Sequence, residues 1–325
     1  MNILLTSAGR RSYLVEYFKE AVQGKGYVIA ANSIADTPAM RAADKSFVLP
    51  FVYEENYLDA LLDICKKERV DFLFSLHDLE GPILSQNKLK IEALNVNVVV
   101  PNPEIINLCL DKFSTYKFLV KHNINTPKTW LKPSDIKTKH FPLIVKPRFG
   151  FGSINHLFVN GRTELNFAFQ YLESRKNHKL LDYLGVNEEE SATIIQEVID
   201  SDEYGIEILN DYQGNYVAQF QKMKLGMRAG ETDSAKIIKN VLLSELGVLI
   251  SKTVKHIGML DCDVFFKNKV PYVLEMNPRF GGQYPFSHMA GANVPEVLIS
   301  NFKKQVRFPE VDTIFVKDIT IVKYE

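Results

Sequence analysis

A lysine at the end of an apolar run is followed closely by two glycines. Residues 143–145 are apolar and lead into Lys146, and Gly150 and Gly152 follow in the next turn. Glycine has no Cβ, so backbone N–H groups in such a turn can approach an anion closely. A lysine held beside the turn suits a polyphosphate. A β-hairpin ending in a surface lysine explains the same residues, because Gly-x-Gly is common and the full Gly-x-x-x-x-Gly-Lys pattern is absent.

A carboxylate, an amide and an arginine occupy alternate positions farther along the chain. Residues 272–277 are predicted to form a strand, in which Glu275 and Asn277 share a face because side chains repeat every two residues. Their oxygens are ligands that a hard cation such as Mg²⁺ prefers. Arg279 follows two residues later and can contact a phosphoryl oxygen.

The strand predicted before this one carries two more carboxylates. If residues 261–266 pair antiparallel with the strand of Glu275, Asp263 can complete the metal set. Asp261 is expected to be a turn residue. Surface strands with polar outward positions are the alternative interpretation.

An acidic turn interrupts another apolar strand candidate. Residues 193–199 are mostly apolar, and three carboxylates follow within residues 200–203. Such a break can offer backbone groups to an adenine edge and a carboxylate to ribose hydroxyls. Acidic turns between strands are also commonly just solvated, and this feature alone does not separate the two interpretations.

Strands and helices alternate over the first part of the chain, which indicates a parallel sheet with crossover helices. The predicted strands lie at residues 2–5, 27–31, 70–76 and 95–100, with helical spacing at 14–22 and 57–67. No Gly-x-Gly-x-x-Gly follows the first strand, so this Rossmann-like unit is a poor candidate for dinucleotide binding. Gly9, His77, Asp78 and Glu80 would share its carboxyl edge, either as part of an acceptor site or as ordinary loop residues.

The pattern changes near Lys112. A helix over 112–122, a hairpin around Lys146 and a helix over 163–172 predict a small α+β unit. Strands dominate from residue 192 onward, around a long helix over 240–257.

Composition excludes several classes of function. The 325 residues are 46% hydrophobic, and 39 Lys plus Arg balance 39 Asp plus Glu. A neutral chain lacks the basic excess typical of nucleic-acid binding and of anionic membrane surfaces. Three separated cysteines argue against a disulfide framework or zinc site and favour a reducing compartment. With no secretory signal and no long apolar run expected, we predict a cytoplasmic location.

These motifs, in this order, resemble the ATP-grasp superfamily of ATP-dependent carboxylate–amine ligases, and most of all its short members related to the large subunit of carbamoyl phosphate synthase. The resemblance is carried by residues 141–147 with the glycine loop and by residues 275–279, and it covers essentially the whole chain. It implies a pre-ATP-grasp α/β domain at 1–104, a linker helix with a lid subdomain at 105–190, and a C-terminal subdomain at 191–325. The last two form the two lobes of an α+β ATP-grasp domain.

The resemblance also implies roles for individual residues. For ATP, it implies phosphate contacts by Lys112 and Lys146, a mobile loop with Gly150, Gly152 and Ser153, an adenine hinge at Glu197 and Val198, and a ribose contact by Glu203. For Mg²⁺ or Mn²⁺ it implies Asp263, Glu275 and Asn277, and for catalysis Arg279 with Lys146. For the substrate it implies Arg228, Glu231, Gly281 and Arg10. Asp263 departs from the Glu or Gln often found there in related synthetases.

The implied reaction is phosphorylation of a small carboxylate by ATP, followed by attack of an amine on the acylphosphate. A carboxylate- or carbamate-phosphorylating subunit like half of a carbamoyl phosphate synthase is one alternative. A nucleotide-binding regulatory module without turnover is another, although such a module would not need Arg279. The expected partners are small molecules, with no nucleic acid and no membrane, and the resemblance implies a homodimer.

Overall fold

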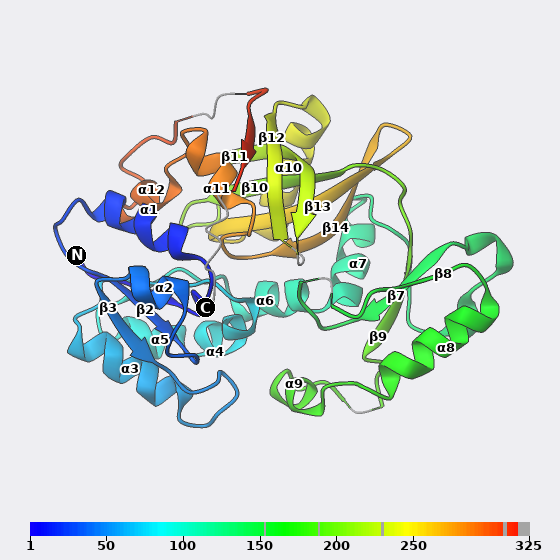
Figure 1. The fold of residues 1–325 in the computed structure, drawn as a ribbon, viewed down its shortest axis with the longest axis horizontal. Helices are drawn as coiled ribbons and strands as arrows, with labels where there is room; N and C mark the ends of the chain where they lie inside the picture. Colours follow the sequence, from blue (N-terminus) through cyan, green and yellow to red (C-terminus); the bar gives the residue numbers. More distant parts are fainter. Residues whose placement is uncertain (153, 188, 229–230, 308–310, 318–325) are drawn as a thin grey trace, which may run out of the picture.

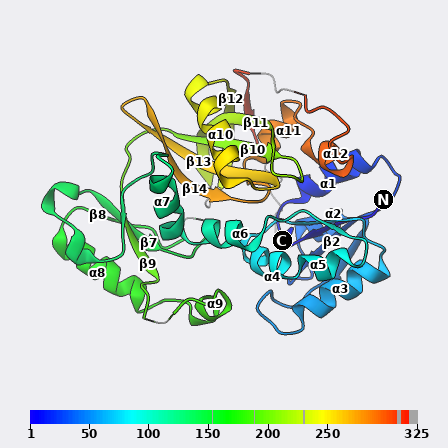
Figure 2. The same ribbon diagram turned by 180° about the vertical axis from the view of Figure 1, so that it is seen from behind.

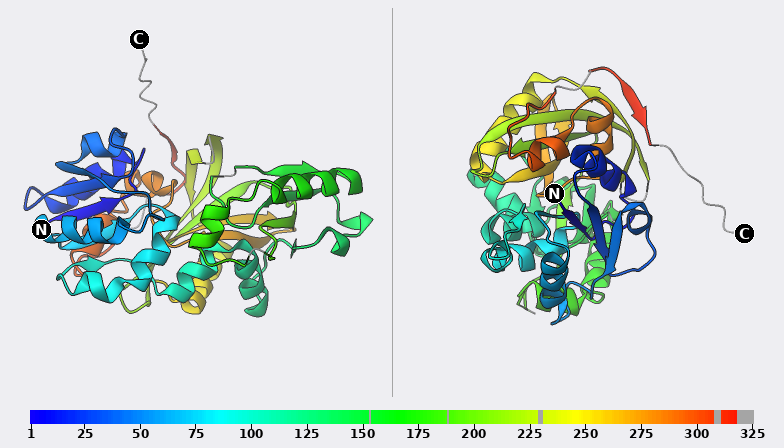
Figure 3. Two further views of the ribbon diagram at one scale, coloured as in Figure 1. Left: turned by 90° about the horizontal axis from the view of Figure 1, so that it is seen from below. Right: turned by 90° about the vertical axis from the view of Figure 1, so that its left-hand side faces the viewer.

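The computed structural model describes residues 1–152, 154–187, 189–228, 231–307 and 311–317. Three sheets follow one another along the molecule (Figure 1). Viewed from below, the sheet formed within residues 3–98 and the sheet formed within residues 129–197 lie at opposite ends of the long axis. The largest sheet lies between them (Figure 3). The same arrangement is visible from behind (Figure 2).

The first sheet is parallel, with the order β3-β2-β1-β4-β5. Its strands are β1 (Ile3–Thr6), β2 (Val28–Asn32), β3 (Lys45–Val48), β4 (Phe72–Ser75) and β5 (Asn97–Val98). The helices around it are α1 (Ser12–Val22), α2 (Pro38–Ala42), α3 (Tyr57–Lys67), η1 (Asp78–Glu80), α4 (Gly81–Gln86) and α5 (Lys88–Glu92). The central strands are buried on both faces, as a sheet covered by crossover helices requires. The predicted Rossmann-like domain is confirmed.

The second sheet is antiparallel, with the order β6-β9-β7-β8. It consists of β6 (Thr129–Trp130), β7 (Leu143–Pro147), β8 (Leu157–Val159) and β9 (Thr193–Glu197), with α8 (Arg162–Glu173), α9 (His178–Tyr183) and the short turns η2 (Pro133–Asp135) and η3 (Thr138–His140). Leu165, Ala168 and Leu172 of α8 pack onto Leu143 and Val145. This packing covers one face and leaves the other for the cavity described below.

The third sheet has six strands in the order β14-β13-β10-β11-β12-β15. They are β10 (Glu203–Asn210), β11 (Tyr216–Arg228), β12 (Glu231–Ile238), β13 (Gly258–Lys267), β14 (Val270–Asn277) and β15 (Ile314–Val316). The helices α6 (Pro103–Leu110), α7 (Lys112–Lys121), α10 (Val241–Val254), α11 (Tyr284–Met289) and α12 (Val294–Ile299) complete the chain. The strands β12 and β15 were not among the predicted strands.

The three parts share apolar cores. Phe18 of α1 contacts Phe280, which follows β14, with ring centroids 5.9 Å apart. On the other side, Phe151 and Leu184 pack against the core of the first domain. The Tyr183 hydroxyl donates a 2.7 Å hydrogen bond to the Leu79 carbonyl. The first domain is therefore attached to both of the sheets that follow it.

The predicted division at residues 104 and 190 stays a prediction. The strand β9 lies in the last predicted segment but pairs with β7. The three cysteines are free and buried. No helix in the described part of the chain has the length and apolar character needed to cross a membrane.

Candidate active site

A cavity of about 350 Å³ lies between the second and third sheets. Ile144 and Phe158 line it from the second sheet, and Phe265 and Leu274 line it from the third. Apolar walls on opposite sides suit a flat aromatic base.

The connection between β9 and β10 forms one end of this cavity, where Glu197, Val198 and Glu203 line it. The Glu197 carboxylate is engaged: it accepts hydrogen bonds from Lys267 and, at 3.2 Å, from the Lys128 backbone N–H. A contact from this segment to adenine would therefore come from the backbone, whereas the Glu203 carboxylate lies at the cavity itself.

Two lysines lie on the cationic side of the cavity. Lys146 is only 2% exposed, and its burial, with the nearby charge of Lys112, lowers its pKa to about 8. The Lys112 Nζ donates a 2.6 Å hydrogen bond to the Gly150 carbonyl. Asp111 caps the helix that begins with Lys112 and accepts two 2.7 Å hydrogen bonds from Arg148, which fixes this helix end.

The glycine loop borders the same space. Gly150 and Gly152 both line the cavity. Gly152 has φ +64°, a conformation that favours glycine, and a Cβ at Gly150 would lie 3.2 Å from Pro147. The predicted loop residue Ser153 lies outside the described residues.

Asp263 and Glu275 form the acidic side, as cross-strand partners on β13 and β14, and the predicted antiparallel pairing of these strands is confirmed. Burial and neighbouring carboxylates raise the pKa of Asp263 to about 8, although Lys224 opposes this. Burial would also raise the pKa of Glu275, but Lys112 and Lys146 lower it below its ordinary value. The lysines and carboxylates thus influence one another across the cavity.

Lys224 is a site residue that sequence reasoning missed. Its Nζ lies 2.5 Å from carboxylate oxygens of both Glu203 and Asp263. Burial disfavours its charge, but these two carboxylates raise its pKa above the usual value. The signal was present in the sequence, since Lys222 and Lys224 share one face of an otherwise largely apolar strand.

The residues on the acidic side supply only part of the set of ligands that a divalent cation needs. Within the described residues, no group of three or more His, Cys, Asp and Glu side chains is placed to hold a metal. Asp263, Glu275 and the Asn277 amide offer two carboxylates and one neutral oxygen. This donor set suits Mg²⁺ when phosphate oxygens of a nucleotide complete it, as is usual for that ion.

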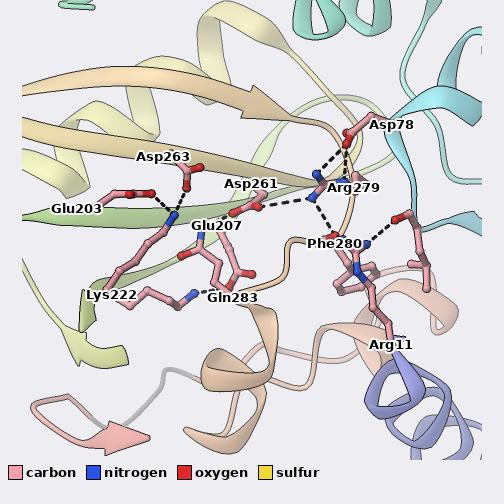
Figure 4. Close-up of polar contacts among 12 residues, drawn as sticks. Arg11, Asp78, Glu203, Glu207, Lys222, Asp261, Asp263, Arg279, Phe280 and Gln283 are labelled. Carbon is pink, nitrogen blue, oxygen red and sulfur yellow. Dashed lines mark hydrogen bonds and ion pairs between the residues drawn. The ribbon is translucent and has the colours of Figure 1, made fainter. Parts of the chain in front are cut away.

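Arg279 is held between two aspartates (Figure 4). Its Nη2 donates a 2.8 Å hydrogen bond to Oδ2 of Asp78, and its Nη1 lies 3.5 Å from Oδ2 of Asp261. These carboxylates raise the pKa of Arg279 despite its burial, and Arg279 in turn lowers the pKa of Asp78 against the effect of burial. The expectation that Asp261 lies in a turn is wrong: it is a buried residue of β13, and Gln283 donates to it.

The acidic residues after β4 have separate roles. Asp78 contacts Arg279, as described above. Glu80 accepts hydrogen bonds from Thr6 at 2.6 Å and from Ser7 at 2.8 Å, and a further one from Tyr57. Glu80 is therefore bound within the first domain. A part in an acceptor site stays a prediction for this group.

The structure brings only some of the predicted substrate residues close together. Arg10 lies 3.9 Å from Glu231. Gly281 packs so closely on Asp261 that a Cβ there would lie 2.0 Å from its Oδ2. Arg228 pairs in backbone register with Glu231, but its side chain is directed to Asp233 at 2.8 Å. Their role toward a substrate stays a prediction.

The cavity lies between two antiparallel sheets, with Lys146 of the second sheet and Lys112 at the start of α7 opposite carboxylates of the third sheet. This is the arrangement typical of nucleotide-dependent phosphoryl-transfer enzymes. The model of the ATP-grasp domain matches residues 109–283, and the chain belongs to this family. Residues 3–99 match the N-terminal domain of PylC-like proteins.

The chain is also similar to the following proteins. An uncharacterised protein of Methanocaldococcus jannaschii is 26% identical over 317 residues, covering 92% of this chain and 74% of that protein. The C-terminal section of the carbamoyl phosphate synthase large chain from the same organism is 25% identical over 75% of this chain, which spans 40% of that section. The crystal structure of an L-amino acid ligase from Bacillus licheniformis shares the fold, with a TM-score of 0.69 and 21% identity over 92% of this chain and 73% of that one.

Proposed function

We propose that this protein is an ATP- and Mg²⁺-dependent ligase that activates a small carboxylate as an acylphosphate for attack by an amine. The observation that carries the proposal is the opposition of Lys112 and Lys146 to Asp263 and Glu275 across one cavity, with Arg279 held nearby. The family membership and the relatives named above support it.

In the first step, an oxygen of the substrate carboxylate attacks the γ-phosphorus of ATP. The bond from that phosphorus to the β–γ bridging oxygen breaks, and its electron pair leaves with ADP. Such transfers need positioning and neutralised charge rather than covalent help from the protein. Lys112 and Lys146 would supply positive charge from one side, and we expect Arg279, which Asp78 holds, to stabilise the transferring group.

Asp263, Glu275 and Asn277 would hold magnesium. When bound, the ion neutralises phosphate charge. The antiparallel ladder supports this assignment, because it pairs Glu275 with Asp263 and Asn277 with Asp261. Lys224 holds Asp263 and Glu203 in place from the neighbouring strand.

In the second step, the amine lone pair forms a C–N bond with the acylphosphate carbon. The C–O bond to phosphate breaks, phosphate leaves with that electron pair, and the nitrogen loses one proton. Water competes with the amine, so the intermediate must be enclosed. We expect the loop with Gly150 and Gly152, which lines the cavity, to cover the phosphates.

A carboxylate- or carbamate-phosphorylating activity is the second candidate, favoured by the match to carbamoyl phosphate synthase. A cytoplasmic location and a homodimer belong to the proposal as well. The three buried thiols fit a reducing compartment.

The deciding experiment measures ADP formation from ATP and Mg²⁺ with a panel of amino acids and simple carboxylates, each with and without hydroxylamine or a second amino acid. We expect one acid to stimulate ADP formation and to yield a hydroxamate or amide. ADP formation with bicarbonate alone would support the second candidate. Nucleotide binding without any acid-dependent turnover would contradict both.

A further inference from the structure

One oxygen of a buried carboxylate has no hydrogen-bond partner. The Asp78 side chain is 7% exposed, and its Oδ2 accepts both N–H groups that Arg279 directs toward it, at 2.8 and 3.1 Å. Its Oδ1 is buried without a partner within the described part of the chain. Buried polar atoms are rarely left unpaired, because losing water without a replacement bond costs free energy.

The space beside this oxygen is small and has a mixed lining of polar and apolar residues. Asp78 lines a cavity of about 20 Å³ together with Cys109, Phe151 and Pro278, three residues that offer it no strong donor. A volume of this size holds one water-sized group. Since Oδ1 bonds to none of the lining residues, a small group that donates an N–H or O–H would satisfy it.

The same cavity reaches the residues proposed to bind phosphate and magnesium. Lys112, Glu275 and Asn277 also line it. The Lys112 Nζ already donates to the Gly150 carbonyl. The carboxylates of Asp78 and Glu275 outnumber the one lysine among the lining residues, so the net charge here is negative and favours a cation or a strong donor over an anion. An amino group is therefore favoured at this position over a carboxylate substrate.

We propose that Oδ1 of Asp78 accepts an N–H from the amine substrate, so that the amine is held by the first domain beside Arg279. The ligand class is ammonia or a primary amine, and this inference rests on the proposed ligase function. Arg279 then contacts the phosphoryl group while its partner Asp78 contacts the nucleophile. The Arg279–Asp78 ion pair thus positions both reactants of the second step, the acylphosphate and the amine.

A pair of matched variants tests this assignment. Asp78→Asn and Asp261→Asn each remove one of the two negative charges beside Arg279, but only Asp78 lines the small cavity. In Asp78→Asn, the amide oxygen can still accept from Arg279, which turns the amide NH₂ toward the cavity. The amine would then face a donor where it needs an acceptor.

The probe is hydroxylamine, used with whichever acid stimulates ADP formation in the unaltered protein. We expect the KM for hydroxylamine to rise about tenfold or more in Asp78→Asn relative to Asp261→Asn, the loss of one hydrogen bond to a charged group. The single-turnover yield of ADP without amine should be similar in the two variants. Equal hydroxylamine KM values in the two variants would show that Asp78 acts only through Arg279 and would overturn the proposal.

A crystal structure with MgADP and methylamine gives a second measurement. We expect the methylamine nitrogen about 2.7–3.2 Å from Oδ1 of Asp78. A water in that place at saturating methylamine would contradict the assignment. If no acid stimulates ADP formation in the unaltered protein, the proposed function itself fails, and that outcome is seen before any variant is made.

Discussion

The guanidinium of Arg279 is bound by Asp78, a residue 201 positions earlier in the chain, through two hydrogen bonds to one carboxylate oxygen. Arg279 follows the last long strand of the third sheet, whereas Asp78 follows the fourth strand of the first domain. A second contact joins the same regions, because Arg11 donates to the carbonyls of Leu76 and Phe280. The orientation of the candidate catalytic arginine therefore depends on the first domain.

Replacing Arg279 by methionine should abolish phosphoryl transfer while leaving nucleotide binding nearly intact. Loss of a donor that acts in the transition state typically lowers kcat by about 10²–10³-fold. Arg279→Lys should recover little, because lysine lacks the planar fork that Asp78 and Asp261 hold. Acid-dependent ADP formation and the binding of a fluorescent ATP analogue measure the two effects. A large loss of binding in Arg279→Met would contradict this role.

Nucleotide affinity should fall at alkaline pH. The pKa of Lys146 is lowered to about 8, so its ammonium is charged below that value and loses its proton as pH rises through it. Phosphate binding favours the charged form. The affinity should therefore be nearly constant between about pH 6 and 7.5 and then weaken, approaching about tenfold per pH unit.

Lys146→Arg provides the matched control for this titration, because a guanidinium stays protonated over the whole range. Its nucleotide affinity should not follow the alkaline decline. Isothermal titration with ADP at several pH values tests both proteins. A decline of equal size in Lys146→Arg would assign the titration to another group.

Turnover should require a divalent cation, and Glu275→Gln should raise the Mg²⁺ concentration that turnover requires. Burial alone disfavours a charged Glu275, but Lys112 and Lys146 keep its pKa below the ordinary value, so the carboxylate is ionised at neutral pH. The variant removes one anionic donor from the metal set. EDTA should stop ADP formation, and excess Mg²⁺ should partly restore the variant. Asp36→Asn, on an exposed ion pair with Arg41, is the control and should leave the Mg²⁺ dependence unchanged.

The Lys222–Glu207 pair should behave as a stability element. Both side chains are fully buried, with Nζ 2.5 Å from Oε2, and Ser287 donates to the same carboxylate oxygen. Removing one partner leaves a buried charge, so Lys222→Met should lower the free energy of unfolding by about 3–5 kcal/mol. Replacing both residues by methionine should recover much of this loss. Urea denaturation of the two single variants and the double variant measures the coupling, and additive losses would refute it.

Much of the architecture could be predicted from local patterns in the sequence. Apolar runs separated by helical spacing predicted the parallel first sheet, because its central strands are buried on both faces. Alternation predicted that Glu275 and Asn277 share a face, and the pairing of Asp263 with Glu275 followed from two adjacent strands. Each of these predictions rests on a pattern within one element or on elements that follow one another along the chain.

Relations between distant segments were not predictable in this way. The ion pair of Arg279 with Asp78 depends on how the first domain packs on the third sheet, which no local spacing encodes. Asp261 was misplaced because an aspartate near a strand end resembles a turn residue, whereas Arg279 and Gln283 compensate its burial. Lys224 was overlooked because its carboxylate partners lie on other strands.

The hydrogen bond from Tyr183 to the Leu79 carbonyl has a kinetic consequence. It joins the last residue of α9 to the first domain, next to where Phe151 packs. If the second sheet swings outward to admit a nucleotide, this contact must break first. It must re-form before the active site is closed against water. Exchange of spent ADP for fresh ATP is then governed by a contact remote from the reacting atoms, and the slowest event in each cycle need not be chemical.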